Sequence, residues 1–329
     1  MNLLTTVTAS TTTELLNYNL LLACPDPATA EVLELIELGI RAPSVLICGE
    51  SGTGKEIVAR ALHEASDRRR GPFIEVNCGA LPPTLMDDAL FGHERGAFTG
   101  ATEMRRGAFE RAHNGTLLLD EIGEMPLDQQ PRLLRVLEGH GFERLGGERQ
   151  IQSDFRLIAA TNRKLEELQR AGSFRPDLFH RLDTFSIDVP PLRGRPRDVP
   201  HFVRLFAGEI PIAPEAFEWA TGHLWPGNVR QLKNRFERAR VLSAGQEIQI
   251  RHLAREVDNI STLTCDAGFL KQLMSVGFWK AVDFVEKELL RAYLLKYGND
   301  KRAVARNSGL RVSTLYDKLR EHHLFEPRK

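Results

Sequence analysis

The sequence predicts an α/β protein in which helices flank a parallel β-sheet, followed by a helical segment and a basic, all-helical C-terminal domain. Short apolar runs alternate with amphipathic stretches up to about residue 190, residues 191–257 look helical throughout, and residues 286–329 carry 11 Lys and Arg against 6 Asp and Glu. Alternating strands and helices are typical of a parallel sheet that is covered on both faces. The expected strands are residues 44–48, 73–76, 116–119 and 155–159, and the expected helices between them include 31–39, 56–65 and 129–137.

The composition is that of an ordinary globular protein. Of 329 residues, 42% are hydrophobic and 27% are charged, and 44 Lys and Arg balance 44 Asp and Glu. These values exclude collagen-like, disulfide-scaffold and wholly disordered chains. No apolar stretch reaches the roughly 20 residues that span a bilayer, and the Thr-rich start lacks the basic segment of a signal peptide. Four widely spaced cysteines form no C-x-x-C pair, so we expect reduced thiols and a cytoplasmic location.

We expect five segments along the chain. They are a short leader over residues 1–19, an α/β core over 20–190, a helical lid over 191–257, a linker over 258–281 and a C-terminal domain over 282–329.

A glycine-rich segment follows the first expected strand and precedes a helix. Its residues are Gly49, Glu50, Ser51, Gly52, Thr53, Gly54, Lys55 and Glu56. In this context glycines let backbone N–H groups surround phosphates, and Lys55 supplies a charge for the β- and γ-phosphates of a nucleotide. Glu56 stands where the general P-loop pattern has Ser or Thr, a usual magnesium ligand. The alternative is a simple glycine-rich turn.

Polar residues end two further expected strands. Asp120 and Glu121 follow the apolar run 116–119, where Asp120 would hold Mg²⁺ and Glu121 would orient the attacking water. Thr161 and Asn162 end another strand and could sense the γ-phosphate, because ligands gather at the carboxyl ends of parallel strands. Solvated strand ends are the alternative in both places.

A glycine-flanked aromatic residue lies between these motifs. The segment GAFTGA consists of Gly96, Ala97, Phe98, Thr99, Gly100 and Ala101. An exposed Phe on a flexible loop suits contact with a partner protein. A Phe buried in a glycine-rich hairpin is the alternative.

Taken with the P-loop, this segment resembles the signature of the bacterial enhancer-binding proteins, which are AAA+ activators of sigma-54 RNA polymerase. The resemblance covers about residues 20–242 and the last 45 residues. It implies an AAA+ P-loop ATPase with a helical lid and a C-terminal Fis-type helix-turn-helix domain. It also accounts for Glu56, because the P-loop of this family has the sequence ESGTGKE.

The resemblance implies roles for further residues. Asn77 matches the Asn that restrains the catalytic glutamate, here Glu121. Arg175 and Arg181 match arginine fingers that reach the ATP of a neighbouring subunit, and Arg230 matches the second sensor of the lid. Without the resemblance these arginines would be ordinary surface or ion-pair residues. Family members form rings, usually hexamers, which implies self-assembly.

The C-terminal segment predicts three helices, over residues 285–290, 300–307 and 312–322, in a helix-turn-helix arrangement whose last helix enters the major groove. The residues available to DNA are Arg311, Ser313, Thr314, Lys318 and Arg320. The segment resembles the Fis-type domain, although Val312 and Ser308 depart from its usual pattern. A three-helix oligomerisation or docking module is the alternative.

The implied function is that of an ATP-hydrolysing transcription activator with ATP and Mg²⁺ as cofactors. It would bind enhancer DNA and convert the closed complex of sigma-54 RNA polymerase to the open complex. One alternative is an AAA+ remodeller of another class with a DNA-binding tail, which gives no reason for GAFTGA. Another is a non-enzymatic DNA-binding regulator, which Lys55, Asp120 and Glu121 disfavour. Fewer than about 25 residues precede the expected ATPase core, too few for a receiver domain, so we expect a separate regulatory protein or expression level to control it.

Overall fold

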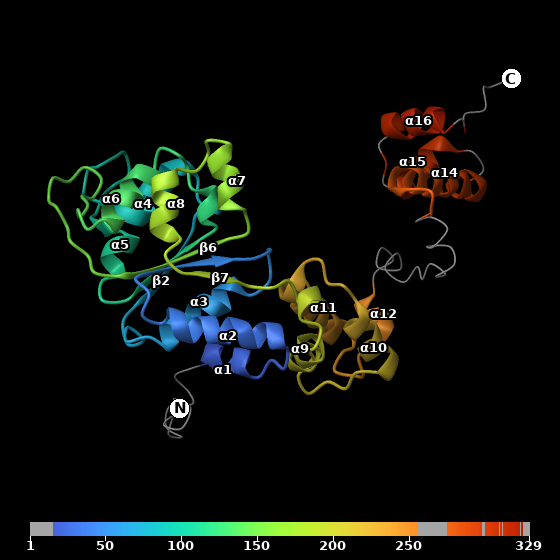
Figure 1. Ribbon diagram of the computed structural model, residues 1–329, viewed down its shortest axis with the longest axis horizontal. Coiled ribbons are helices and arrows are strands. Elements are labelled where there is room, and N and C mark those ends of the chain that lie inside the picture. The colour runs from blue at the N-terminus through green and yellow to red at the C-terminus, as the bar shows by residue number, and fades with distance from the viewer. Residues whose placement is uncertain are drawn as a thin grey trace. The chain divides into compact units, whose positions relative to one another are not determined.

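The structure is a computed structural model that describes residues 16–254 and, with gaps at 298–299, 309, 311 and 323, residues 275–324. The chain divides into two compact units, residues 1–257 and 258–329. The first unit holds a sheet with its helices and a second group of helices, and the second unit is a small helical domain (Figure 1). None of the helices in the described ranges has the length and apolar character needed to cross a membrane.

Five parallel strands form the main sheet, in the order β2-β5-β6-β1-β7. Their bounds are β1 Ser44–Cys48, β2 Phe73–Asn77, β5 Thr116–Asp120, β6 Arg156–Thr161 and β7 Ser186–Asp188. The four predicted strands are confirmed, whereas β7 was not predicted because it has only three residues, of which only Ile187 is buried. Because all strands run in the same direction, their carboxyl ends meet at one edge of the sheet, as the motifs require.

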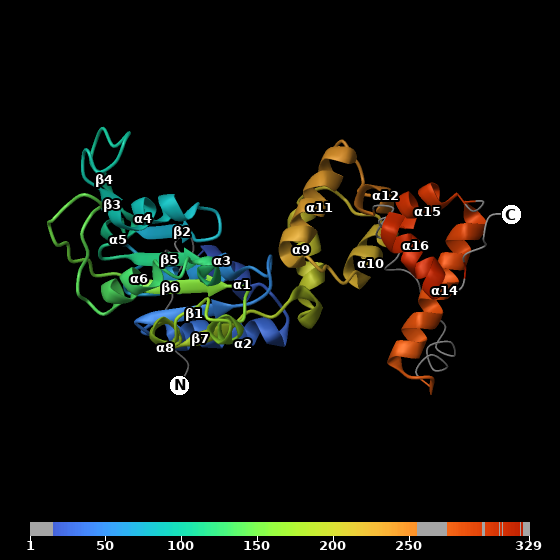
Figure 2. The same ribbon diagram turned by 90° about the horizontal axis from the view of Figure 1, so that it is seen from above.

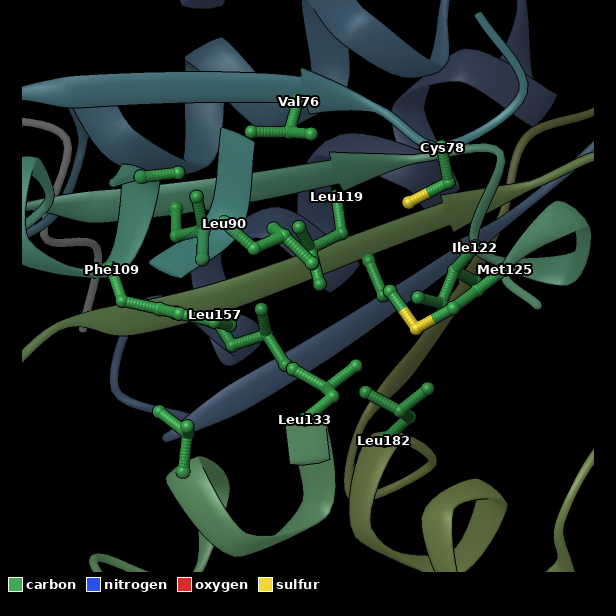
Figure 3. Close-up of a cluster of buried hydrophobic side chains, with 14 of the residues drawn as sticks. Val76, Cys78, Leu90, Phe109, Leu119, Ile122, Met125, Leu133, Leu157 and Leu182 are labelled. Atoms are coloured by element: carbon green, nitrogen blue, oxygen red, sulfur yellow. The ribbon is translucent and has the colours of Figure 1, made fainter. Parts of the chain in front are cut away.

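Helices cover both faces of the sheet, as predicted. Val45 and Ile47 of β1 pack with α1 Leu16–Leu22, α2 Pro27–Gly39 and α3 Lys55–Glu64. Leu46 points to the other face, which is covered by α4 Pro83–Phe91, α5 Ala108–Arg111, α6 Gln130–Leu137, α7 Leu165–Arg170 and α8 Pro176–Leu182. Figure 3 shows this second face, where Leu119 and Leu157 of the strands lie near Leu133 of α6. This alternation is the period of two that a buried strand imposes.

A small ribbon lies beside the sheet. Its strands, β3 Gly92–His93 and β4 Arg105–Arg106, are antiparallel and are joined by residues 94–104. The connecting loop projects from the α/β core (Figure 2). A short 3₁₀ turn, η2 Ile122–Glu124, follows β5.

The segment predicted as a helical lid is helical. It contains η3 Leu192–Gly194, α9 Asp198–Ala207, α10 Pro214–Gly222, α11 Asn228–Leu242 and α12 Ile250–Leu253. Trp225, Leu232 and Phe236 lie at the centre of its own hydrophobic cluster. Strand-like pairing between the described residues of this segment is limited to a single bridge, Ile212 to Ile248.

The described residues of the second unit include the helices α14 Phe278–Lys296, α15 Lys301–Ser308 and α16 Val312–Glu321. They enclose a cluster that includes Leu290, Val304, Leu315 and Leu319. The three predicted helices are therefore confirmed, but α14 is longer than expected and begins inside the predicted linker. Likewise, α1 begins at Leu16, inside the predicted leader. The rest of the leader and residues 258–274 of the linker lie outside the described residues.

Candidate functional site

The loop between β1 and α3 contains the predicted phosphate-binding residues. Gly52 and Gly54 have φ angles of 78° and 105°, a left-handed backbone that glycine adopts without strain. Helix α3 begins at Lys55, directly after this loop. Phosphate groups would therefore face a helix N-terminus, where free N–H groups and the helix dipole favour negative charge.

Lys55 is buried beneath this loop, with 7% of its surface exposed. Its Nζ donates to the carbonyl oxygens of Gly49, at 2.9 Å, and Glu50, at 3.2 Å. Burial is the largest influence and lowers the pKa of the ammonium group, while the charges of Glu121 and Asp120 oppose that shift. The acidic end of β5 therefore acts electrostatically on the lysine of the P-loop.

The carboxylates of Asp120 and Glu121, at the end of β5, have different hydrogen-bond partners. Asp120 Oδ1 accepts a hydrogen bond from the backbone N–H of Glu121 at 3.0 Å. Glu121 has a φ of 52°, which is uncommon for a residue with a side chain and is often found at functional sites. Its Oε2 lies 3.4 Å from the backbone nitrogen of Asn162, at the end of β6. The structure thus brings Asn162 beside Glu121.

The resemblance implied a contact between Asn77 and Glu121, but the structure shows Asn77 bonded to Asp120 instead. Its Nδ2 donates to Asp120 Oδ2 at 3.2 Å, and its Oδ1 accepts from the backbone nitrogens of Gly79 and Ala80. The reason is strand register, because Asn77 is paired with Asp120 in the sheet. Glu121 lies one residue beyond the end of that pairing.

The donor set at this edge fits a magnesium ion. Asp120 is half-buried, and its carboxylate lies beside the P-loop. Mg²⁺ commonly binds one or two carboxylates together with substrate phosphates and water. Over residues 16–254 and the described part of 275–324, no group of three His, Cys, Asp or Glu side chains could hold a metal alone. The arrangement therefore suits a cation that arrives with a nucleotide.

The lid contacts the P-loop through the beginning of α11. Arg230 Nη1 lies 3.2 Å from Ser51 Oγ, and its backbone N–H donates to the carbonyl of Gly52 at 3.2 Å. A Cβ added to Gly52 would lie 2.6 Å from the carbonyl oxygen of Gly227. Glycine is therefore required at position 52 by close approach as well as by its φ angle.

A largely apolar cavity of about 230 Å³ adjoins the P-loop, and the sequence analysis did not identify it. Its lining includes Leu20, Val32, Ile57, Val189, Phe202 and Phe206, from α1, α2, α3, the end of the sheet and α9. These side chains follow ordinary helical and strand periodicity, so they resemble core residues. The cavity arises only when segments far apart in the sequence, from α1 to α11, come together.

Arg175 and Arg181 lie on the exposed surface at the N-cap of α8 and within it. Arg175 forms a two-atom pair with Asp177, and Arg181 Nη2 donates to the carbonyl of Leu137 at 2.6 Å. In the described part of the chain, neither side chain bonds to a residue of its own P-loop. The structure therefore does not bring these two predicted residues to the site.

The segment Gly96–Ala101 forms a closed turn in the loop between β3 and β4. Gly96 N–H donates to the carbonyl of Ala101 at 2.8 Å, and Ala101 N–H donates to that of Phe98 at 3.0 Å. Phe98 is 45% exposed, so the interpretation as a buried hairpin residue is wrong. The rings of Phe98 and His93 are in an edge-to-face arrangement, with 4.9 Å between their centroids.

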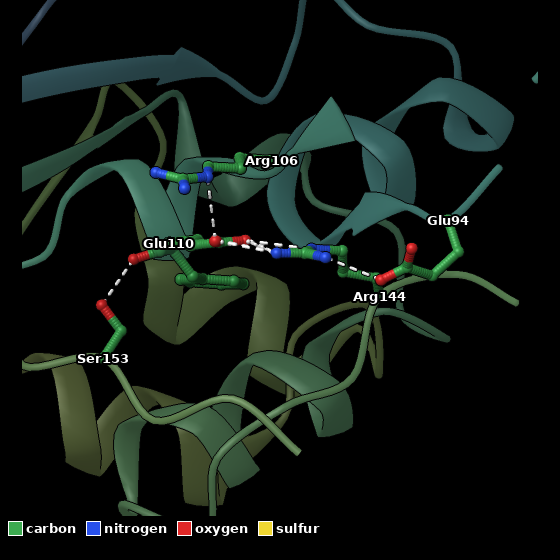
Figure 4. A network of polar contacts seen from close by, with 6 residues as sticks. Glu94, Arg106, Glu110, Arg144 and Ser153 are labelled. Atoms are coloured by element: carbon green, nitrogen blue, oxygen red, sulfur yellow. Dashed lines mark hydrogen bonds and ion pairs between the residues drawn. The ribbon is translucent and has the colours of Figure 1, made fainter. Parts of the chain in front are cut away.

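An ion-pair cluster holds the base of this loop (Figure 4). Arg144 Nη1 donates to Glu94 Oε1 at 2.6 Å, and its other nitrogens donate to both carboxylate oxygens of Glu110. Arg106 also pairs with Glu110, at 3.2 Å. The cluster links residues 94–104 to the segment 138–154.

The predicted DNA-binding residues lie mostly on α16. Ser313 and Arg320 are exposed and Thr314 is half-buried, while Arg311 lies outside the described residues. Lys318 forms an ion pair with Glu286 of α14. That contact holds its charge against the domain itself, which the sequence analysis did not anticipate.

Three family models match the chain. The model described as "Sigma-54 interaction domain" matches residues 23–188, "AAA+ ATPase lid domain" matches 193–265, and "Bacterial regulatory protein, Fis family" matches 281–322. The chain is 44% identical to the regulatory protein AtoC of Escherichia coli over 90% of its length and 66% of AtoC. It is 42% identical to the regulator NtrC of Klebsiella pneumoniae, covering 90% of the chain and 68% of NtrC.

Among solved structures, NtrX from Brucella abortus in complex with ATP is similar to this chain. The TM-score is 0.66 at 34% identity, over 91% of the chain and 68% of NtrX. The chain spans 66% of AtoC and 52% of the regulator NtrC from Salmonella typhimurium.

Proposed function

The chain belongs to the sigma-54 interaction family of AAA+ ATPases, and from this premise we propose that it hydrolyses ATP to activate transcription by sigma-54 RNA polymerase. One observation carries the proposal. A buried P-loop lysine faces the acidic end of β5, in the same unit as a loop that exposes Phe98. The first feature serves nucleotide chemistry, and the second serves contact with a protein.

ATP occupies the P-loop and the adjoining cavity in this proposal. Backbone N–H groups of residues 49–55 bind the phosphates, Lys55 contacts the β- and γ-phosphates, and the apolar cavity takes the base. The similar protein NtrX was solved in complex with ATP, which supports ATP as the nucleotide. Arg230, next to Ser51, completes the phosphate side from the lid.

Asp120 holds Mg²⁺, and the bound cation neutralises charge on the phosphates. Asn77 acts through Asp120, because its amide fixes one oxygen of that carboxylate. Glu121 orients the attacking water and accepts its proton, and its position beside Asn162 leaves it close to the end of β6. Glu56, exposed and paired with Arg60, contributes no contact to this set of carboxylates.

Arg175 and Arg181 act on the ATP of a neighbouring subunit. Their exposure, and the lack of contact with their own P-loop in the described chain, support this role. An arginine supplied by a second subunit stabilises charge in phosphoryl transfer and makes hydrolysis depend on assembly. We therefore propose a ring, of the hexameric size common in the family.

The loop residues Gly96–Ala101 contact sigma-54, and the second unit binds enhancer DNA. Hydrolysis moves the loop and converts the closed promoter complex to the open complex. Arg311, Ser313, Thr314, Lys318 and Arg320 are the proposed contacts to DNA. An AAA+ remodeller of another class would also use the P-loop, but the match of the sigma-54 model over residues 23–188 favours the activator.

The test combines two single substitutions. Lys55→Ala should abolish ATP binding and hydrolysis, because the loop loses the positive charge that contacts the β- and γ-phosphates. Thr99→Ala should retain hydrolysis within about twofold, since Thr99 is exposed and far in sequence from the P-loop, yet lose sigma-54 binding in the presence of ADP and aluminium fluoride. Hydrolysis by the Lys55→Ala protein, or sigma-54 binding by the Thr99→Ala protein, would contradict the proposal.

A further inference from the structure

Glu50 belongs to the P-loop, but its side chain bonds to the lid. Its Oε1 and Oε2 accept hydrogen bonds from Arg193 Nη2 at 2.5 Å and Nη1 at 2.8 Å. Oε2 also accepts from Asn228 Nδ2 at 3.2 Å. These contacts lower the pKa of Glu50 to about 2, with Arg193 as the largest cause. The carboxylate is therefore charged at any working pH.

The two partners of Glu50 come from two separate parts of the lid. Arg193 lies in η3, where the chain enters the lid after β7. Asn228 is the first residue of α11, the helix that carries Arg230. One carboxylate thus connects the P-loop to both the entry of the lid and its second-sensor helix.

Asn228 is built into this connection. It is fully buried, and its φ of 54° is left-handed, a conformation that Asn tolerates better than most residues. Its Oδ1 accepts from the backbone N–H of Leu192 at 2.7 Å, and its Nδ2 also donates to the carbonyl of Ser51 at 3.0 Å. The oxygen of the Asn228 amide therefore bonds to the lid entry, and its nitrogen bonds to the P-loop.

The lid cannot move away from the P-loop without breaking these contacts. Arg230 N–H bonds to the carbonyl of Gly52, and Gly52 has no room for a side chain against Gly227. The side chains of Glu50 and Arg193 are 44% and 46% exposed. An ion pair this exposed adds little to global stability, so it can open and close without unfolding the domain.

We propose that Glu50 is a positioning residue that latches the lid to the P-loop and fixes Arg230 beside the phosphate site. The Glu50 carboxylate then adds a side-chain link between the P-loop backbone of residues 49–55 and α11, beside the bonds of Asn228 to Ser51 and of Arg230 to Gly52. The consequence for ATP turnover rests on the proposed ATPase function, whereas the latch itself does not.

Hydrogen–deuterium exchange of the full chain without nucleotide tests the latch directly. The backbone N–H groups of Arg230 and Leu192 report it. The N–H of Arg230 bonds across the junction to the carbonyl of Gly52, and the N–H of Leu192 bonds to Oδ1 of Asn228, whose Nδ2 donates to Glu50. Glu50→Arg places two cations together, and we expect both amides to exchange at least about fivefold faster. Arg193→Glu should do the same, and the charge-swapped double variant should return exchange to within about twofold of the original.

Matched variants keep this test decisive. Glu237→Gln removes an exposed lid carboxylate that pairs with Lys233 on the same helix, and it should leave both amides unchanged. Glu50→Gln, which keeps an acceptor for Asn228, should give a smaller increase and serves if Glu50→Arg fails to fold. Unchanged exchange in the Glu50 variants, or a double variant that shows the sum of both single effects, would overturn the proposal.

Nucleotide kinetics test the positioning role. In Glu50→Arg we expect kcat to fall about tenfold while the Kd for ATP changes less than about threefold, with kcat recovered in the double variant. A rise in Kd as large as the fall in kcat would refute positioning of Arg230. An altered exchange rate with an unaltered kcat would refute it as well. If the original protein hydrolyses no ATP, the proposed function fails, and the exchange experiment still decides the latch.

Discussion

Ala97 of the GAFTGA turn lies directly against Gly146. A Cβ added to Gly146 would be 2.8 Å from the Cβ of Ala97 and 2.9 Å from its Cα. Gly146 also has a φ of 71°. The two loops therefore meet through backbone contact that leaves no space for a side chain, and the nearby Arg144 pairs reinforce that contact.

Gly146→Ala should displace the GAFTGA turn without disturbing the nucleotide site. We expect sigma-54 binding to weaken about tenfold, because a contact loop has moved, and ATP hydrolysis to stay within about twofold. Gly139→Ala is the matched control, since Gly139 has a similar φ of 82° but nothing within 4 Å of an added Cβ. Equal loss of sigma-54 binding in both variants would attribute the effect to backbone strain instead of the contact with Ala97.

Arg175→Ala and Arg181→Ala should each bind ATP but lose roughly 10³-fold in hydrolysis, because the arginine acts on another subunit's nucleotide. Mixing Arg175→Ala with Lys55→Ala should restore part of the activity, since some interfaces then combine an intact P-loop with an intact arginine. Arg170→Ala, which removes an exposed arginine from α7, should hydrolyse ATP normally. Failure of the mixture to exceed either variant alone would argue against action between subunits.

Glu286→Gln should strengthen DNA binding. The ion pair with Glu286 raises the pKa of Lys318 and holds its charge against α14, so removing the carboxylate frees that charge for a phosphate. We expect Kd for enhancer DNA to fall about threefold and the slope of log K against log salt to steepen by about one. Glu288→Gln removes the same charge from α14 but frees only Arg291, and a comparable gain there would refute the role of Lys318.

Arg156→Leu should destabilise the first unit by about 2–4 kcal/mol. Arg156 is 5% exposed, and burial lowers its pKa to about 10. It donates to the carbonyls of Gly39 and Leu62, near the ends of α2 and α3, and the leucine variant leaves both without that donor. Urea denaturation followed by circular dichroism measures the change.

The control for this prediction is Arg163→Leu, which removes a half-exposed arginine paired with Glu124. Its free energy of unfolding should change by less than about 1 kcal/mol. Similar losses in both variants would mean that burial of Arg156 has no special effect.

The sequence predicted the strands and motifs well because their signals are local. The run 116–119 is buried on both faces, and Asp120 must follow it at the edge where ligands gather. The turn around Phe98 is likewise set by two glycines with left-handed backbones, at positions 96 and 100.

Features that depend on distant segments could not be predicted in this way. The apolar cavity beside the P-loop joins α1 to the lid, and Leu20 and Phe202 have the periodicity of ordinary core residues. Asn77 bonds to Asp120 because of strand register, which a motif does not encode. The bond of Glu50 to Arg193 joins residues 143 positions apart, and the P-loop motif that contains Glu50 does not indicate a partner in the lid.

The carbonyls of Gly49 and Glu50 already hold the ammonium group of Lys55 in place. When a triphosphate binds, the ammonium group of Lys55 exchanges these carbonyls for phosphate oxygens. Little conformational entropy of the loop is then lost. Little binding energy is therefore consumed in ordering the loop, and association should be fast.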